Sequence, residues 1–102
     1  MGFKIIILPS VYNEVSDAFN YYESKSPGLD ERFYNDYIDS IARLKNNPLY
    51  YSYYHEFYRR ISLATFPYMI IYKVKDEETV IVYAVVYEGR NPTYIKEKIY
   101  SE

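Results

Sequence analysis

Three arginines mark the two ends of a strand-rich region and are the residues best suited to binding or catalysis. Arg59 and Arg60 open this region, and Arg90 closes it. A guanidinium group can hold a phosphate or form paired contacts across a protein interface. If the ends of the strands that carry them approach one another, the three cations can act on one ligand.

A proton acceptor is harder to find near these arginines. Tyr87 lies three residues before Arg90, but an unperturbed tyrosine has a pKa of about 10 and is a poor base. Glu56 and Glu88 are ordinary surface carboxylates. His55 is the only histidine and lies in an irregular connector, so we interpret it as structural or exposed. Cysteine is absent, and we expect neither a cofactor nor a metal.

The N-terminal half predicts a strand followed by a helical hairpin. Residues 3–8 form a run rich in β-branched residues that ends before a proline, which is typical of a strand buried on both faces. Ser10 can cap a helix over residues 11–24, and a second helix begins at Leu29 and stops at Asn46. The first helix carries its apolar stripe at Val11, Val15, Ala18, Phe19 and Tyr22.

The C-terminal half predicts a sheet. Residues 49–56 have no clear period and connect the hairpin to strands at 57–64, 67–75 and 79–87. The short connections between these strands force antiparallel neighbours. The strand at 79–87 is apolar on both faces and therefore belongs inside the sheet.

The element order β-α-α-β-β-β predicts an α+β fold, with an N-terminal strand, a two-helix antiparallel hairpin and a three-stranded antiparallel meander. The helices are expected on one face of the sheet. A chain of 102 residues suits one domain, so we predict a single domain over residues 1–102. Its residues 93–102 form a polar tail that can be helical.

Charge and hydropathy limit the classes of partner. The chain is 49% hydrophobic and 25% charged, and it has no apolar run long enough for a membrane span, so we expect no membrane association and a cytoplasmic protein. Residues 1–40 carry a net charge of −4, whereas residues 41–102 carry +2. Any nucleic acid would therefore meet the C-terminal half. The alternative is that the asymmetry reflects only a solvated acidic helix face.

These features together resemble the RelE/ParE superfamily of bacterial toxins from toxin-antitoxin pairs, and the ParE branch most closely. The resemblance covers residues 4–92 and rests on the length, the element order and the spacing of short motifs. The motifs are Arg59-Arg60, Phe66-Pro67-Tyr68 followed by Ile70-Ile71-Tyr72, and Gly89-Arg90-Asn91-Pro92. Members commonly place a histidine shortly before the closing arginine, where this chain has Tyr87.

The resemblance implies one of two activities. One branch cleaves mRNA on the ribosome by driving a ribose 2′-OH onto the neighbouring phosphate, which needs cations, a base and an acid. In that case Arg59, Arg60, Arg90 and Tyr87 are the candidate catalytic residues. The other branch binds and inhibits DNA gyrase without catalysis, and the three arginines then contact the target. A pI of about 5.4 and the missing histidine favour gyrase.

Two further alternatives are less specific. The protein can be an inactive toxin fold that is kept as a binding module. In a purely structural alternative for Arg59 and Arg60, one of them pairs with the acidic first helix while the other points to solvent, because neighbouring strand residues face opposite ways.

The resemblance also implies protein partners. A cognate antitoxin is expected to fold along the groove between hairpin and sheet. The residues predicted to bind it are Tyr22, Tyr34, Tyr58, Met69 and Ile71, with the faces of the three tyrosines exposed. The toxin is expected as a homodimer or in a toxin-antitoxin hetero-oligomer.

Overall fold

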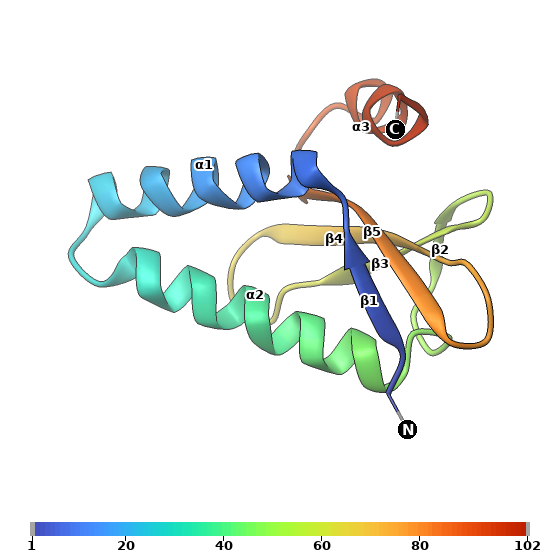
Figure 1. Cartoon of the computed structure of the whole chain (residues 1–102). Helices are drawn as coiled ribbons and strands as arrows, with labels where there is room; N and C mark the ends of the chain where they lie inside the picture. Colours follow the sequence, from blue (N-terminus) through green and yellow to red (C-terminus); the bar gives the residue numbers. More distant parts are fainter. Residues whose placement is uncertain (1, 102) are drawn as a thin grey trace.

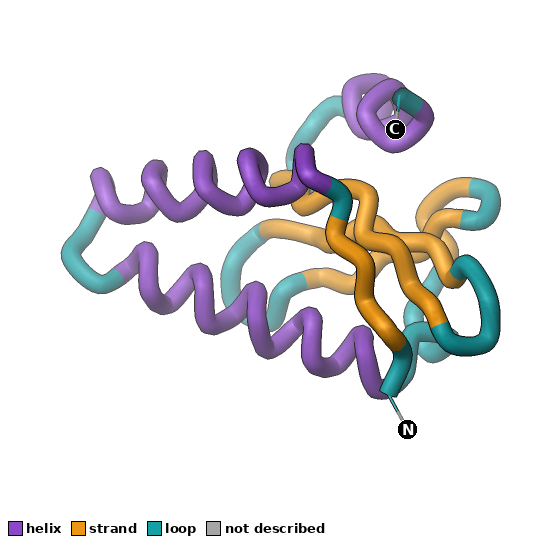
Figure 2. The backbone as a smooth tube through the Cα atoms, in the orientation of Figure 1, coloured by secondary structure: helices purple, strands orange, loops and turns teal. Residues whose placement is uncertain are grey.

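The computed structural model describes residues 2–101, so residues 1 and 102 of the predicted domain lie outside the described part. Figures 1 and 2 show a helical hairpin, a twisted sheet and a separate C-terminal helix. In chain order the elements are β1 (Lys4–Ile7), α1 (Pro9–Lys25), α2 (Leu29–Asn46), β2 (Tyr53–His55), β3 (Tyr58–Ser62), β4 (Tyr68–Val74), β5 (Thr79–Tyr87) and α3 (Pro92–Tyr100).

The five strands form one mixed sheet in the order β1-β5-β4-β3-β2. The predicted meander is confirmed as β3, β4 and β5, which pair antiparallel. β5 lies inside the sheet, as its two apolar faces predict, and β1 pairs parallel to it from Lys4 opposite Thr79 to Ile7 opposite Val82. The α+β class predicted from the sequence is therefore confirmed.

Both edges of the sheet differ from the prediction. β1 is an edge strand with an exposed Lys4, so the prediction that it is buried on both faces is wrong. At the opposite edge, part of the irregular connector forms β2, which pairs with β3. The turn between them is made by Glu56 and Phe57, and Glu56 has a φ of 50°. Tight hairpin turns need such left-handed residues, but the sequence offers no glycine or asparagine there to signal one.

The hairpin α1–α2 packs on one face of the sheet and encloses the larger core. Its centre contains Val11, Phe33 and Leu44 from the helices and Ile70 and Tyr72 from β4, each with 0% of its surface exposed. Met69 and Ile71 of β4 alternate to the opposite face, as period-two side chains must. The first turn of α1 departs from the prediction, because Ser10 is not the cap. The helix begins at Pro9, and the N-cap position belongs to Leu8.

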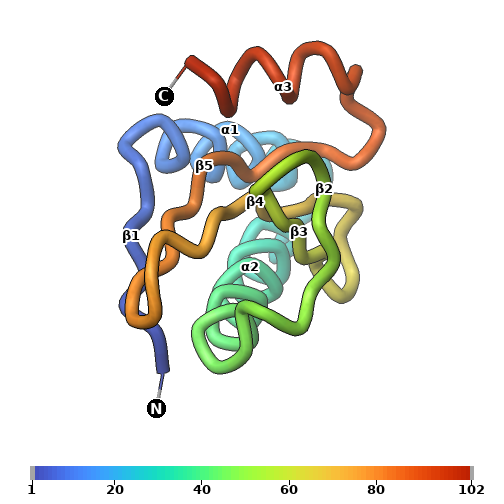
Figure 3. Tube along the Cα trace, turned by 90° about the vertical axis from the view of Figure 1, so that its right-hand side faces the viewer, coloured from blue at the N-terminus to red at the C-terminus, as the bar shows by residue number. Residues whose placement is uncertain are grey.

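The opposite face of the sheet is covered by α3, which Figures 1 and 3 show lying across the sheet from α2. Ile95 and Ile99 are buried there against Met69, Ile71 and other apolar side chains. The C-terminal segment is thus helical, but it is not a polar tail. The prediction that helices cover one face holds for the hairpin alone, and α3 adds a third layer. Among residues 2–101, no helix is both long and apolar enough to cross a membrane.

Candidate functional site

A hollow lies where the C-terminal end of β5 meets α1 and the loop to α3. It has a volume of about 250 Å³, and we call it the α1–β5 pocket. The side chains that give it its chemistry are Glu14, Asp17, Tyr21, Tyr68, Tyr87, Arg90 and Tyr94. The pocket therefore combines two carboxylates, one guanidinium and four tyrosines.

The helical wall of the pocket follows from spacing. Glu14, Asp17 and Tyr21 occupy positions i, i+3 and i+7 of α1, which place them on one side of a helix. β1 stops pairing with β5 at Val82, and beyond that point the carboxylate of Glu14 accepts a hydrogen bond from the backbone N–H of Val85 at 3.0 Å. A side chain of α1 thus accepts a hydrogen bond from the backbone of β5 at a position that β1 no longer reaches.

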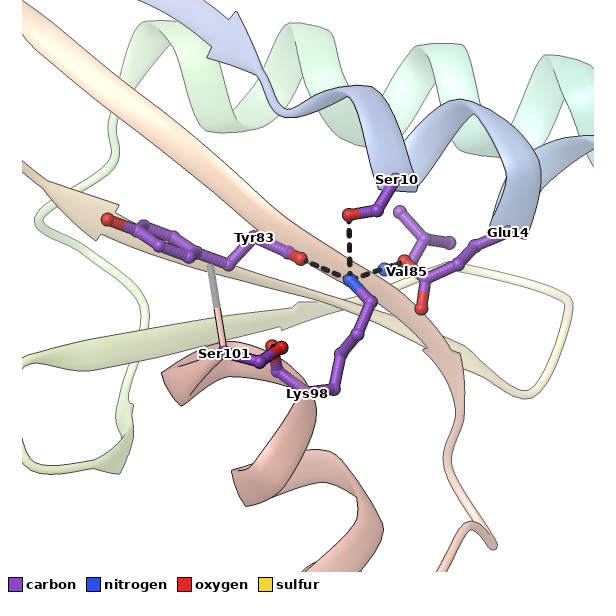
Figure 4. Close-up of polar contacts among 6 residues, drawn as sticks. All are labelled: Ser10, Glu14, Tyr83, Val85, Lys98 and Ser101. Atoms are coloured by element: carbon purple, nitrogen blue, oxygen red, sulfur yellow. Dashed lines mark hydrogen bonds and ion pairs between the residues drawn. The ribbon is translucent and has the colours of Figure 1, made fainter.

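Glu14 is also neutralised. The ammonium of Lys98 from α3 lies 3.4 Å from Glu14 Oε1, and it donates to the carbonyl of Tyr83 at 2.8 Å and to Ser10 Oγ at 3.1 Å. Figure 4 shows Lys98 reaching between α1 and β5 to make these contacts. Ser10, predicted as a helix cap, instead accepts a hydrogen bond from Lys98 and so contributes to the contact between α1 and α3.

Asp17 is the unneutralised carboxylate of the pocket. Its side chain is exposed, and it makes no hydrogen bond or ion pair with any other residue in the described part of the chain. The sequence interpretation passed over this residue. The signal that could have found it is its i+3 spacing from Glu14 on the side of α1 that carries Tyr21.

The loop wall is built by the Gly-Arg-Asn-Pro motif. The backbone N–H of Arg90 donates to the carbonyl of Tyr87 at 3.0 Å, which closes a turn. Gly89 packs so closely that an added Cβ would lie 2.5 Å from the Tyr87 ring, so a side chain there would displace that ring. Asn91 then caps α3 by accepting a hydrogen bond from Thr93 N–H at 2.8 Å.

The aromatic side chains of this wall contact one another and Arg90. The guanidinium of Arg90 lies 4.0 Å from the ring centroid of Tyr94. Tyr87 is 49% exposed, and its ring meets that of Tyr68 edge to face at 6.0 Å. Burial is the main cause that raises the pKa of Tyr68, so this hydroxyl stays protonated near neutral pH.

Arg59 lies elsewhere and holds the connector in place. Its guanidinium donates to the carbonyls of Leu49 and Tyr51 at 3.2 and 2.6 Å, and to the hydroxyl of Tyr53 at 2.9 Å. It also lies 4.0 Å from the ring centroid of Tyr53. The expectation that one of the paired arginines forms an ion pair with the acidic first helix is wrong for Arg59, because carbonyl oxygens take that role.

Arg60 points to the other side of the sheet, as adjacent strand residues must. It is exposed, and its nearest polar partner is the Met69 sulfur at 3.9 Å. Of the predicted catalytic residues, the structure therefore brings only Tyr87 and Arg90 into one pocket, and Arg59 and Arg60 lie in different surroundings. His55 is half-buried, 3.4 Å from Glu56, with its ring against Tyr100.

The residues predicted to bind an antitoxin fall into two groups. Tyr34 is 44% exposed, and Tyr22 is half-buried against Phe33 and Phe66. Tyr58, Met69 and Ile71 are buried under α3, with exposed fractions of 7%, 2% and 0%. The prediction that Tyr58 presents an exposed face is wrong, because α3 covers it. The isoleucines at i and i+4 that follow Asn91-Pro92 were the signal for this packing.

A helical hairpin and a C-terminal helix sandwich a mixed sheet, which agrees with the α+β fold expected from the resemblance to RelE/ParE toxins. Residues 5–92 match the family model of the ParE toxin of type II toxin-antitoxin systems (parDE), and the chain belongs to this family. It is 29% identical over 90 residues to Toxin ParE2 of two Mycobacterium tuberculosis strains, which covers 87% of this chain and 85% of the relative. Membership implies a cognate antitoxin. Within residues 2–101, no group of three or more acidic or histidine side chains could hold a metal ion.

Proposed function

We propose that this toxin acts in the cytoplasm by binding DNA gyrase and inhibiting it without catalysis. The observation that carries this proposal is the composition of the α1–β5 pocket. Tyr87 and Arg90 share that pocket with Glu14 and Asp17. RNA cleavage needs cations around a pentacovalent phosphorus, whereas here a free carboxylate stands beside a single guanidinium.

The positions of the other arginines support the same proposal. The guanidinium of Arg59 already donates hydrogen bonds to Leu49, Tyr51 and Tyr53. It is therefore poorly placed to bind a phosphate. The whole chain carries a net charge of −2, while a ribosome-directed nuclease gains much of its affinity from Lys and Arg contacts to a dense phosphate backbone. A protein target requires only a specific complementary surface.

A second candidate function is ribosome-dependent mRNA cleavage. It is favoured by one observation, the presence of Tyr87 and Arg90 in the same pocket. In that case Arg90 stabilises the phosphate, Tyr87 acts as the proton donor, and the exposed Arg60 contacts RNA from the other face of the sheet. An inactive binding module is the outcome if neither activity is found.

The antitoxin is proposed to bind along the helical hairpin. Tyr34 lines an apolar groove of about 400 Å³ between α1 and α2, together with Tyr12 and Ile38. These three side chains are 44%, 63% and 43% exposed, which suits an amphipathic segment that folds on binding. The predicted contacts at Tyr58, Met69 and Ile71 would require α3 to leave the sheet.

The proposed target is tested with purified toxin in a gyrase supercoiling assay. We expect inhibition that depends on toxin concentration and that is reversed by the cognate antitoxin, encoded by the neighbouring reading frame. Normal supercoiling by gyrase in the presence of folded toxin would refute the proposal. Hydrogen exchange of the toxin with and without antitoxin locates the second surface, where new protection is expected on α1 and α2.

A further inference from the structure

We infer that the α1–β5 pocket receives a basic side chain from the protein that the toxin inhibits, and that Asp17 is the residue that selects it. This inference rests on the proposed function, because it assumes a protein target. It assigns the chemistry of the contact: an arginine or lysine carried by an extended segment, with Asp17 as its counter-ion.

The charges of the pocket carry the first step. The carboxylate of Glu14 is already engaged by Lys98 and by the backbone of Val85. The carboxylate of Asp17 has no hydrogen-bond or ion-pair partner among residues 2–101, although Arg90 lines the same pocket. Arg90 is instead held over the ring of Tyr94 at 4.0 Å. The helical wall of the pocket thus presents the carboxylate of Asp17, and the loop wall presents the guanidinium of Arg90, but the two groups do not form an ion pair.

The aromatic walls carry the second step. Tyrosine rings attract cations through their faces, and this effect grows when water is excluded. Two tyrosines of this pocket already do so within the chain, because Lys25 Nζ lies 5.0 Å from the ring centroid of Tyr21 and Arg90 stacks on Tyr94. The rings of Tyr68 and Tyr87 also line the pocket and offer further aromatic surface to an incoming side chain.

The same arrangement disfavours a phosphate. An anion in the pocket would be attracted by Arg90 but repelled by Asp17, and an isolated cation would meet the reverse, so neither satisfies both walls alone. A peptide segment suits both walls, since its basic side chain can pair with Asp17 while Arg90 donates to one of its carbonyl oxygens. Charged pairs of this kind mainly set the specificity and the association rate of a protein complex.

The experiment is an NMR titration of the isotope-labelled full chain with small probes. The probes are a blocked glycine-arginine-glycine peptide, the same peptide with neutral citrulline in place of arginine, and inorganic phosphate. We expect the arginine peptide to shift amide signals of residues 14–21 and 87–90, and to bind about fivefold more tightly than the citrulline peptide, the scale of an exposed ion pair. Asp17→Asn should remove this preference, whereas Asp39→Asn, at an exposed acid of α2 outside the pocket, should keep it.

Equal binding of the two peptides, shifts outside the pocket, or a stronger response to phosphate would overturn the inference. A preference that survives Asp17→Asn would overturn the role of that residue. The supercoiling assay separates this inference from the proposed target. If the toxin does not inhibit gyrase but binds the arginine peptide through Asp17, the gyrase proposal fails and the pocket assignment stands. If the toxin inhibits gyrase and Asp17→Asn inhibits equally well, the pocket assignment fails.

Discussion

The carboxylate of Asp36, in the middle of α2, accepts a hydrogen bond of 2.9 Å from the backbone N–H of Phe66 in the loop between β3 and β4. The N–H groups of Ala64 and Thr65 donate to the same carboxylate at 3.1 and 2.9 Å. One buried acidic side chain therefore satisfies three consecutive N–H groups of a turn that has no strand to pair with. This contact fixes the hairpin to the sheet.

Replacing this carboxylate should weaken the fold. Asp36→Asn removes the negative charge and points an amide donor at backbone donors, so we expect a loss of about 1–3 kcal/mol in the free energy of unfolding. Urea denaturation of the variant and of the wild type measures the difference. Asp39→Asn, an exposed change one turn further along the same helix, is the matched control and should cost little. Equal stability of all three proteins would show that the turn does not depend on Asp36.

Arg59 should be a structural residue. Arg59→Lys keeps one charge but cannot reach the carbonyls of Leu49 and Tyr51 and the hydroxyl of Tyr53 together. We expect a loss of about 1–2 kcal/mol and faster amide exchange over residues 49–55. Arg60→Lys, at the exposed neighbouring position, should leave both quantities near their wild-type values. The structural assignment fails if the two variants behave alike in stability and exchange.

The ion pair between Glu14 and Lys98 should hold α3 on the sheet. Both side chains are largely buried, with 16% and 15% of their surfaces exposed. Lys98→Met leaves the Glu14 carboxylate without its cation, and we expect a loss of about 2 kcal/mol and faster exchange of the α3 amides. Adding Glu14→Gln should recover part of this loss, because glutamine carries no charge and can still accept from Val85 N–H. A double variant less stable than Lys98→Met would contradict this account of the pair.

Stability should fall at alkaline pH, because tyrosines that are buried in the fold ionise more readily in the unfolded chain. Burial is the main cause that raises the pKa of Tyr37 to about 12, against about 10 in the unfolded chain. Because the folded state holds this proton more tightly, the contribution is complete below pH 10 and is lost as the pH rises through about 12. For Tyr37 alone the loss is up to about 2 kcal/mol. Urea denaturation between pH 8 and 11 should give a steeper decline for the wild type than for Tyr37→Phe. Parallel declines would argue against a raised pKa at Tyr37.

How far the sequence predicts the structure depends on the range of the interactions. The spacing of apolar residues alone predicted the helical hairpin and the three antiparallel strands. Val11 and Val15 follow the helical period and Ile70 and Tyr72 the strand period, and both patterns depend only on nearby residues. The parallel pairing of β1 with β5 joins residues about 75 positions apart and leaves no local signal. The hairpin turn at Glu56 was missed because the strained residue is not a glycine, and α3 was missed as a covering element because only two isoleucines carry its packing.

In the candidate site, too, the features that depend on local sequence were predictable and those that depend on tertiary packing were not. The motif that ends in Arg90 was visible in the sequence, because a turn, an N-cap and a proline follow one another there. The separation of Arg60 from Arg59 was also foreseeable from strand alternation. Which side chains share the pocket was not, because the contribution of α1 through Asp17 and Tyr21 depends on how the hairpin docks on β5.

The central claim, inhibition of gyrase by binding, is tested most directly by assaying one toxin preparation for both activities. We expect inhibition of supercoiling and no ribosome-dependent cleavage of mRNA. Arg90→Ala should weaken the inhibition, with a binding cost of about 2 kcal/mol if Arg90 is a central contact. The contradicting result is mRNA cleavage by the wild-type toxin that Arg90→Ala reduces a hundredfold or more, on the order expected when one charge-stabilising donor of a transition state is lost. That outcome would make the protein a nuclease.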